Sequence, residues 1–375
     1  MLDRLTPVRS QAPAPAEPAT APPEPHAARV TSAAPPGSAA PTPPATKERR
    51  AVDRDALYAE VDTLAARYRA TPDPDLAVAL IDKRFEAAEA YDGAPARADW
   101  PPAYTDPFPD KEPGTLPEVP AAEMTTEVVA GAIAHHGCCV VRGLFSPERV
   151  QRTIDAVHEV ERRRAVPEDE LVPDAWYRPF TGIDPMHQAL RRMVHQQGGT
   201  WLADSPIASA QVLDDLREVG VIDVVADHFG ERPYFSLQKS TLRRSPPVHN
   251  FSGWHQDGSF LGPEVRTLNV WVALTDCGGD RPTPGLEVVP RRVDVLLDTD
   301  GGLGSASISD AQVHATAGDT PTITPPFDAG DALVFDQHFV HRTHLFPEMT
   351  DDRYALECWL FAPSFAAVEY VPLVV

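Results

Sequence analysis

The sequence has little positive charge and no long hydrophobic run. Its 375 residues include 33 Lys and Arg against 55 Asp and Glu, giving a formal net charge of −22. Such a chain repels a polyphosphate backbone, so nucleic acid is not expected as a partner. No apolar stretch approaches the roughly 18 residues of a membrane span, and residues 1–10 lack the hydrophobic core of a signal peptide. We therefore expect neither a membrane span nor export.

Cysteine is also scarce, and its positions exclude several kinds of site. The four cysteines are Cys138, Cys139, Cys277 and Cys358, two of them adjacent, with no metal-finger spacing. They indicate free thiols and a cytoplasmic location. A serine or cysteine hydrolase is not expected, because the G-x-S-x-G motif is missing and Cys138–Cys139 falls in an apolar strand-like run.

Composition divides the chain into three parts. Residues 1–50 hold twelve of the 41 prolines and almost no large apolar side chain, which predicts a disordered tail. Residues 51–124 predict a helical appendage, with amphipathic helices over 53–70 and 76–91 and then a proline-rich crossing. Residues 125–375 alternate short helices and strands and are predicted to form the functional domain.

Within the third part, local signals place individual elements. A helix should end at His136 before Gly137, and another should begin at Pro147 after Ser146 as N-cap. A longer helix is expected over residues 207–229, interruptible at Gly220. Residues 168–205 suit a substrate-covering insertion and an ordinary helical layer equally well.

Short strands dominate the second half of the chain. The clearest alternation covers residues 266–276, with a polar face that includes Asn269 and Trp271. The other strands are expected at 138–145, 234–244, 285–290, 293–297, 322–324, 332–335 and 354–361, separated by Gly, Pro and Asp turns. This spacing predicts a mainly β fold with flanking helices, built on a jelly roll.

The stretch WHQDGSF supplies two candidate metal ligands. Residues i and i+2 of a strand project from the same face, so His255 and Asp257 can converge on one ion. A third ligand is expected at His341, after the apolar run 332–335. Two histidines and a carboxylate leave three positions open, the arrangement of non-heme Fe(II) oxygenases. His338 and His344 compete for this role, but alternation turns His338 away and His344 is expected past the strand end.

An arginine follows twelve residues after the distal histidine. Arg353 opens the alternating run 354–361, and a guanidinium there can hold a dicarboxylate beside the metal. The competing interpretation is a surface ion pair with Asp351 or Asp352.

Together these motifs resemble the phytanoyl-CoA dioxygenase-like family of Fe(II)/2-oxoglutarate oxygenases. The resemblance is carried by His255, Asp257, His341 and Arg353, with WVALTD before GLEVVP and AGDALVFDQHFVHRT before the arginine. It covers about residues 125–364 and implies the double-stranded β-helix, a cupin-like jelly roll, as the oxygenase core.

The resemblance also implies the cofactors and further site residues. Fe(2+) held by the three ligands would use 2-oxoglutarate and O2 to hydroxylate a C–H bond of a small-molecule substrate, with release of succinate and CO2. A carboxylate at Asp257 favours hydroxylation, since halogenating relatives have a small residue there. Thr343 and Trp271 would flank the cosubstrate beside Arg353. Candidate substrate contacts are Gln238, Arg243, Arg244 and Asn269.

Two alternatives stay open. One is a cupin-type metal-dependent oxygenase or isomerase that does not use 2-oxoglutarate, and the other is a non-catalytic jelly-roll binding protein. The chain also departs from the family pattern, with Pro290, Arg291 and Arg292 where relatives commonly have Pro-Gly-Ser-His. The sequence therefore indicates the type of reaction but not the substrate, and CoA thioester, natural-product, amino-acid-like and lipid substrates all remain open.

Overall fold

A computed structural model describes most of the chain after residue 52. The described ranges are 53–90, 99–166, 170, 174–181, 185–236, 239–247, 253–262, 264–299, 307–365 and 372–375. The predicted tail and the candidate residue Gln238 lie outside them. Among the described residues, no helix has the length and apolar character to cross a membrane.

The helices begin and end largely where capping residues predict. They are α1 (Arg54–Ala70), α2 (Pro74–Glu89), α3 (Thr126–His136), α4 (Pro147–Arg164), α5 (Pro185–Gln196), α6 (Pro206–Glu218), α7 (Val221–Phe229), α8 (Gly258–Leu261) and α9 (Asp310–Ala317). The Ser146 side chain accepts from the N–H of Arg149 and so caps α4. Gly137 ends α3 at φ 93, a left-handed conformation that favours glycine.

The strands are short, and most belong to one sheet. They are β1 (Glu118–Pro120), β2 (Cys138–Arg142), β3 (Gly199–Trp201), β4 (Tyr234–Ser236), β5 (Thr241–Ser245), β6 (Thr267–Ala273), β7 (Gly285–Val288), β8 (Ala332–Asp336), β9 (His341–His344), β10 (Arg353–Phe361) and β11 (Pro372–Val374). The major sheet has the order β1-β2-β8-β6-β10-β4-β11, with β5 on the other half of β10 and β3 beside β5.

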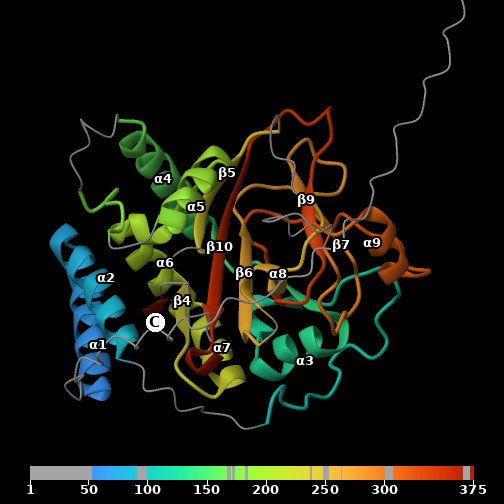
Figure 1. The fold of residues 1–375 in the computed structure, drawn as a ribbon, viewed down its shortest axis with the longest axis horizontal. Helices are drawn as coiled ribbons and strands as arrows, with labels where there is room; N and C mark the ends of the chain where they lie inside the picture. Colours follow the sequence, from blue (N-terminus) through green and yellow to red (C-terminus); the bar gives the residue numbers. More distant parts are fainter. Residues whose placement is uncertain are drawn as a thin grey trace, which may run out of the picture. The chain divides into compact units, whose positions relative to one another are not determined.

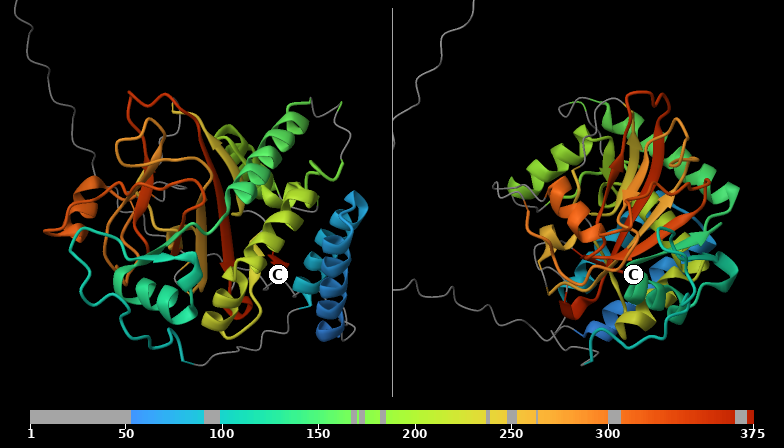
Figure 2. Two further views of the ribbon diagram at one scale, coloured as in Figure 1. Left: turned by 180° about the vertical axis from the view of Figure 1, so that it is seen from behind. Right: turned by 90° about the vertical axis from the view of Figure 1, so that its right-hand side faces the viewer.

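The two faces of the major sheet have different roles, set by strand alternation. Its outer face carries apolar residues such as Val270, Val272 and Leu356, which join one large core cluster with residues of α3, α4, α6 and α7. Its inner face carries Asn269, Trp271 and every second residue of β10 from Arg353 onward. Figures 1 and 2 show α4 and α6 on one side of β10 and the strands β7 and β9 on the other.

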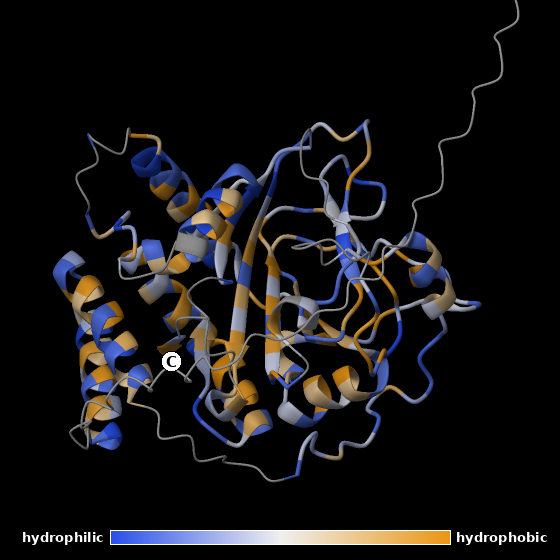
Figure 3. Cartoon of the chain, viewed as in Figure 1, coloured by the Kyte–Doolittle hydropathy of each residue, from blue (hydrophilic) through white to orange (hydrophobic). Residues whose placement is uncertain are grey.

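A minor sheet covers the inner face. Its strands β7 and β9 pair directly, Trp254 and His255 form single bridges to Ile308 and His341, and Val288 bridges to Ile323. Figure 3 shows β6 mostly hydrophobic and β9 hydrophilic.

The connection order between the sheets defines the fold. Beginning at β5, the chain alternates between the sheets: β5, β6, β8 and β10 belong to the major sheet, and the segments between them contribute residues 254–255, then β7 with the bridging residues Ile308 and Ile323, and then β9 to the minor sheet. This order is a double-stranded β-helix, as the sequence predicts, with helices packed against the outer face of the major sheet.

Several expected elements differ in their boundaries. The expected strand over 234–244 is two strands, β4 and β5, which pair with different parts of β10. The expected helix over 207–229 is interrupted at Gly220, the position that the sequence indicated, because Gly220 adopts φ 82 between α6 and α7. Residues 293–297 form no strand, and only Ile323 of 322–324 bridges to a neighbour. Within residues 168–205, the described part contains α5, the strand β3 and a short 3-10 helix at Leu202–Asp204.

The first helix, α1, packs against α2, and α2 packs against the C-terminal strand β11. Residues of α2 contact α6 and β11, and the buried Arg84 guanidinium donates to the carbonyl of Val374 at 2.5 Å. The division of the chain at residue 124 stays a prediction.

Gly330, just before β8, offers a test of this packing. At φ 101, a Cβ built on Gly330 would lie 2.3 Å from the carbonyl oxygen of Phe145. Gly143 also has a positive φ, 65, but a Cβ there meets nothing within 4 Å. We expect Gly143→Ala to cost about 1–2 kcal/mol of unfolding free energy from strain alone, and Gly330→Ala to cost more. Urea denaturation of both variants measures the difference, and equal losses would contradict the backbone contact.

Candidate metal centre

The two candidate histidine ligands are direct neighbours across strands. The N–H of His255 donates to the carbonyl of His341 at 3.0 Å, and the N–H of His341 donates back at 3.1 Å. Residues paired in this way project side by side, and the two imidazole centroids are 4.3 Å apart. Backbone pairing therefore brings together two residues that are 86 positions apart in the sequence.

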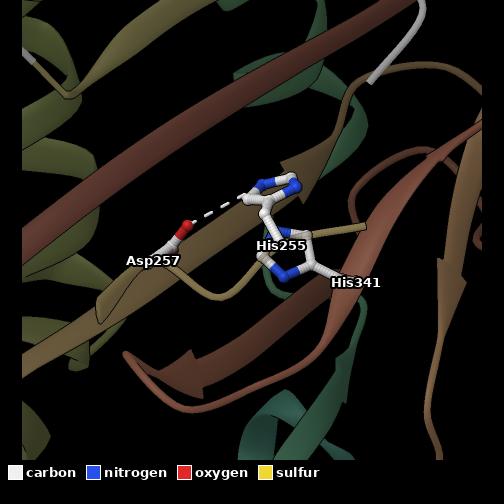
Figure 4. Close-up of side chains that lie close together, drawn as sticks. All are labelled: His255, Asp257 and His341. Carbon is white, nitrogen blue, oxygen red and sulfur yellow. Dashed lines mark ion pairs between the residues drawn. The ribbon is translucent and has the colours of Figure 1, made fainter. Parts of the chain in front are cut away.

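The carboxylate reaches the same point by a different route from the one expected. Asp257 does not continue the strand; it precedes α8 with φ −62 and ψ −31, so the chain has already turned. Its Oδ1 still lies 3.9 Å from Nε2 of His255, as Figure 4 shows. One ligand atom from each of His255, Asp257 and His341 lies within 4.8 Å of the others. In the described ranges this is the sole such group of three or more His, Cys, Asp or Glu side chains.

Backbone carbonyls set the orientation of both imidazoles. Nδ1 of His255 is 2.9 Å from the carbonyl oxygen of Gly253, and Nδ1 of His341 is 3.1 Å from that of Phe339. A carbonyl only accepts, so each Nδ1 carries the proton and each Nε2 presents its lone pair to the cluster. Metal-binding histidines are commonly oriented in this way.

Burial prepares the three groups for a cation. It lowers the pKa of both His255 and His341 to about 4, so both rings are neutral at neutral pH. Burial raises the pKa of Asp257 to about 6, against the lowering effects of His255, Lys239 and the Asn269 hydrogen bond. The set is thus two neutral imidazoles and a carboxylate, the protonation states that a divalent metal requires.

Asn269 fixes the remaining carboxylate oxygen. Its Nδ2 donates to Oδ2 of Asp257 at 3.2 Å from the inner face of β6, which leaves Oδ1 directed toward His255. The sequence suggested Asn269 as a substrate contact. In the structure its amide nitrogen donates instead to the carboxylate of the candidate metal ligand Asp257.

Arg353 is a buried cation on the same inner face. Its side chain donates to the carbonyl of Gly285 at 3.0 Å and to Oγ of Ser245 at 3.3 Å, while its Nε has no hydrogen-bond partner. Burial lowers its pKa to about 10, so it stays charged at neutral pH. The surface pairing with Asp351 or Asp352 is wrong, because Arg353 is 1% exposed and Asp352 pairs with Arg244.

A buried guanidinium without a direct carboxylate contact fits an anionic ligand. No carboxylate among the described residues lies within ion-pair distance of Arg353. The indole Nε1 of Trp271 is also buried without a hydrogen-bond partner, and its ring lies 5.8 Å from the guanidinium carbon. Unmatched buried donors of this kind are costly unless a ligand accepts from them.

The other predicted residues are placed on both sides of the sheets. Thr343 shares a face of β9 with His341, opposite Leu286 of β7. Arg243 lies on the inner face of β5, where its guanidinium meets Glu357 with Nε–Oε1 at 2.9 Å. Arg244 alternates to the outer face and pairs with Asp352 and Glu161, so it is not brought to the metal side.

Neither competing histidine belongs to the cluster. His338 precedes β9, with its Nδ1 3.7 Å from Asp336. His344 is the last residue of β9 rather than beyond it, but it faces away from His341 and lies 3.6 Å from Glu287.

Two further residues, one on the inner face and one between the metal ligands in sequence, were not singled out from the sequence. Glu357 is a lone acid in the apolar run 354–361, and its alternation with Arg353 places it on the inner face. Burial alone would raise its pKa, but Arg243 and Arg353 outweigh this and lower it. Gln256 stands between the ligands of the H-x-D motif and is fully buried. Strand alternation was the sequence feature that could have located them, but the register of the strands was not known from the sequence.

Fold and site together define a non-heme iron oxygenase of the double-stranded β-helix class. The chain belongs to the family described as phytanoyl-CoA dioxygenase (PhyH), whose model matches residues 133–345. This is a family of Fe(II)/2-oxoglutarate-dependent dioxygenases, so the predicted family, iron and cosubstrate are confirmed.

Solved structures of similar fold share little sequence with this chain. EctD from S. alaskensis with 2-oxoglutarate and 5-hydroxyectoine is 18% identical, covering 72% of this chain and 86% of that one, with TM-score 0.47. The alpha-ketoglutarate-dependent carbocyclase SnoK from nogalamycin biosynthesis is 18% identical over 65% and 86%, with TM-score 0.42. AviO1 from Streptomyces viridochromogenes Tue57 is 18% identical over 61% and 91%, with TM-score 0.41. The comparison with curated proteins gave no match.

The cluster predicts a single high-affinity metal site. Because outer-shell changes already cost about 10–100-fold in metal affinity, we expect Ala at His255, Asp257 or His341 to weaken Fe(II) binding by more than about 100-fold. Anaerobic titration calorimetry measures this. His344→Ala is the matched control, since it removes an imidazole from the opposite face of β9 and should bind Fe(II) as the wild type does. Equal loss in the control would contradict the assignment.

Proposed function

We propose that this chain is a hydroxylase that acts on an unactivated C–H bond of a small organic substrate. In the balanced reaction, substrate, 2-oxoglutarate and O2 give the alcohol, succinate and CO2. The observation that carries the proposal is the shared inner location of the His255–Asp257–His341 cluster and of Arg353, a buried cation without a carboxylate partner.

The residues fit both missing components. His255, Asp257 and His341 would hold Fe(II) and leave open positions for other ligands. When bound, iron and 2-oxoglutarate supply the oxidising chemistry, and the protein supplies binding and orientation. The oriented Nε2 atoms and the Asp257 carboxylate, fixed by Asn269, require little rearrangement to receive the ion.

Arg353 would bind the distal carboxylate of 2-oxoglutarate. The Gly285 carbonyl and the Ser245 hydroxyl hold the guanidinium in place, and its Nε remains available to a carboxylate oxygen. Thr343, on the His341 face of β9, and the Trp271 indole N–H would flank the cosubstrate. These donors replace the hydration that the carboxylate loses on entering the fold.

The substrate would lie along the polar part of the inner face. Glu357 accepts from Thr241 and Arg243 at 3.0 Å in each case, and neither carboxylate nor guanidinium is fully covered, at 19% and 18% side-chain exposure. Lys239 lies nearby, with Nζ 5.1 Å from the Trp359 ring centroid. We infer a substrate with polar or charged groups that bind to the side chains of Arg243 and Glu357.

A CoA thioester is less well supported than a smaller substrate. A CoA thioester would need cations for its phosphates, but two candidate arginines are already paired: Arg244 with Asp352 on the outer face, and Arg292 with Asp336 at 2.5 Å. Cations already neutralised by carboxylates contribute little to phosphate binding. The four cysteines are buried and free, in keeping with our proposal of a reducing cytoplasmic location.

Removing the Arg353 charge should separate cosubstrate binding from metal binding. Losing one partner of a buried charge pair costs about 2–5 kcal/mol, so we expect Arg353→Met to bind 2-oxoglutarate at least about 30-fold more weakly with unchanged Fe(II) affinity. Arg342→Met is the matched control, because Arg342 lies on the outward face of β9 and pairs with Glu287. Anaerobic titrations with the metal and then with 2-oxoglutarate measure both affinities.

The same titrations distinguish the alternatives. Iron binding without 2-oxoglutarate binding in the wild type would favour a cupin-type enzyme, for which Arg353 is dispensable. Absence of metal binding would favour a non-catalytic jelly roll. Succinate formation that requires Fe(II), 2-oxoglutarate and O2 is the expected result.

A further inference from the structure

Gln256, the middle residue of the H-x-D motif, uses its whole amide group inside the protein. Its Nε2 donates to the carbonyls of His338 at 2.6 Å and Val295 at 2.9 Å, and its Oε1 accepts from the N–H of Leu297 at 2.8 Å. The residue is fully buried. All three of these partners are backbone groups of other segments, so the side chain does not compete with His255 and Asp257 for the ion.

The first of these hydrogen bonds reaches the segment that delivers the distal ligand. His338 lies in the turn between β8 and β9, and the next carbonyl, that of Phe339, orients Nδ1 of His341. The N–H of Gly258 donates to the carbonyl of Gln337 at 2.8 Å. Residues on both sides of Asp257 therefore hold consecutive carbonyls of the turn that leads into His341.

The other two bonds reach a segment with no strand partner of its own. Residues 295–297 were expected to form part of a strand, yet they form none, and the Gln256 amide takes up one carbonyl and one N–H there. Leu296 packs against Gly258 so closely that a Cβ on Gly258 would lie 2.5 Å from its Cδ2. One side chain thus joins three segments that are distant in sequence.

We propose that Gln256 is a positioning residue that fixes the separation between the His255–Asp257 pair and His341, and thereby sets the affinity for the metal. The inference rests on the proposed metal site. It goes beyond that site because Gln256 donates nothing to the ion. Without the amide, the carbonyl of His338 loses its buried donor, and the turn before His341 is free to shift toward another partner.

A purely structural role makes a different prediction. A core glutamine that only stabilises the fold would, when replaced, lower the melting temperature and leave the metal affinity of the folded protein unchanged. If Gln256 positions the ligands, replacing it weakens metal binding more than a core substitution elsewhere that lowers stability by the same amount. The comparison therefore needs a variant of matched stability.

The experiment measures Mn(II) binding to the full-length chain by electron paramagnetic resonance titration, with melting temperatures recorded in parallel. We expect Gln256→Leu to weaken Mn(II) binding by about 10–100-fold, the range for outer-shell partners. Val157→Ala, which truncates a buried side chain of α4 on the outer side of the major sheet, provides the stability match and should bind Mn(II) as the wild type does.

Three results would overturn the inference. Wild-type affinity in Gln256→Leu at a lowered melting temperature would show a structural role only. Equal weakening in Val157→Ala would show that affinity follows stability. Absence of Mn(II) binding in the wild type would remove the metal site itself, and so identifies a failure of the proposed function rather than of Gln256. If Gln256→Leu does not fold, Gln256→Asn, which keeps the amide but is shorter by one methylene, supplies the same comparison.

Discussion

The mutual backbone hydrogen bonds between His255 and His341 are the constraint on which the site depends. Each residue lies at the start or end of a very short pairing, and neither has a long strand to hold it. Their register therefore has to be secured by neighbours, because a slip of one residue would turn an imidazole to the opposite face. The Gln256 amide and the Gly258 N–H, which bind consecutive carbonyls before His341, provide that support. The relative placement of the three ligand side chains therefore depends on the segments that connect the two sheets.

A second constraint is the burial of Arg353 without a carboxylate. The guanidinium crosses from β10 to the Gly285 carbonyl of β7, so it also links the two sheets. Burying a charge costs free energy, and a bound ligand of opposite charge offsets part of that cost. On our proposal, the metal ligands and Arg353 act together: the three ligands bind a cation, and Arg353 binds the far end of an anion that also contacts the metal. This complementarity is more specific than either feature alone.

The ligands were predictable from sequence because they occupy motifs with fixed spacing, while their supports were not. H-x-D, the distal histidine and Arg353 stand out by residue type after apolar strands, and the number of short strands indicates the jelly roll. Asn269 and Gln256 are ordinary amides whose roles depend on register between segments distant in sequence. The separation of β4 from β5 was missed for a similar reason. It depends on tertiary pairing, because each of the two strands pairs with a different part of β10.

The inner face of the major sheet is divided into an apolar part and a charged part. Toward β2 and β8, side chains such as Val140, Leu333 and Phe335 fill the space between the sheets in one apolar cluster. Toward β5 and β10 the same face carries charges, and the Arg243–Glu357 pair retains partial exposure. A packed apolar cluster has no space for a dianion, whereas the charged side gains free energy from polar ligands. This division supports our proposal that the cosubstrate lies between the metal ligands and Arg353 and that the substrate lies beside Arg243 and Glu357.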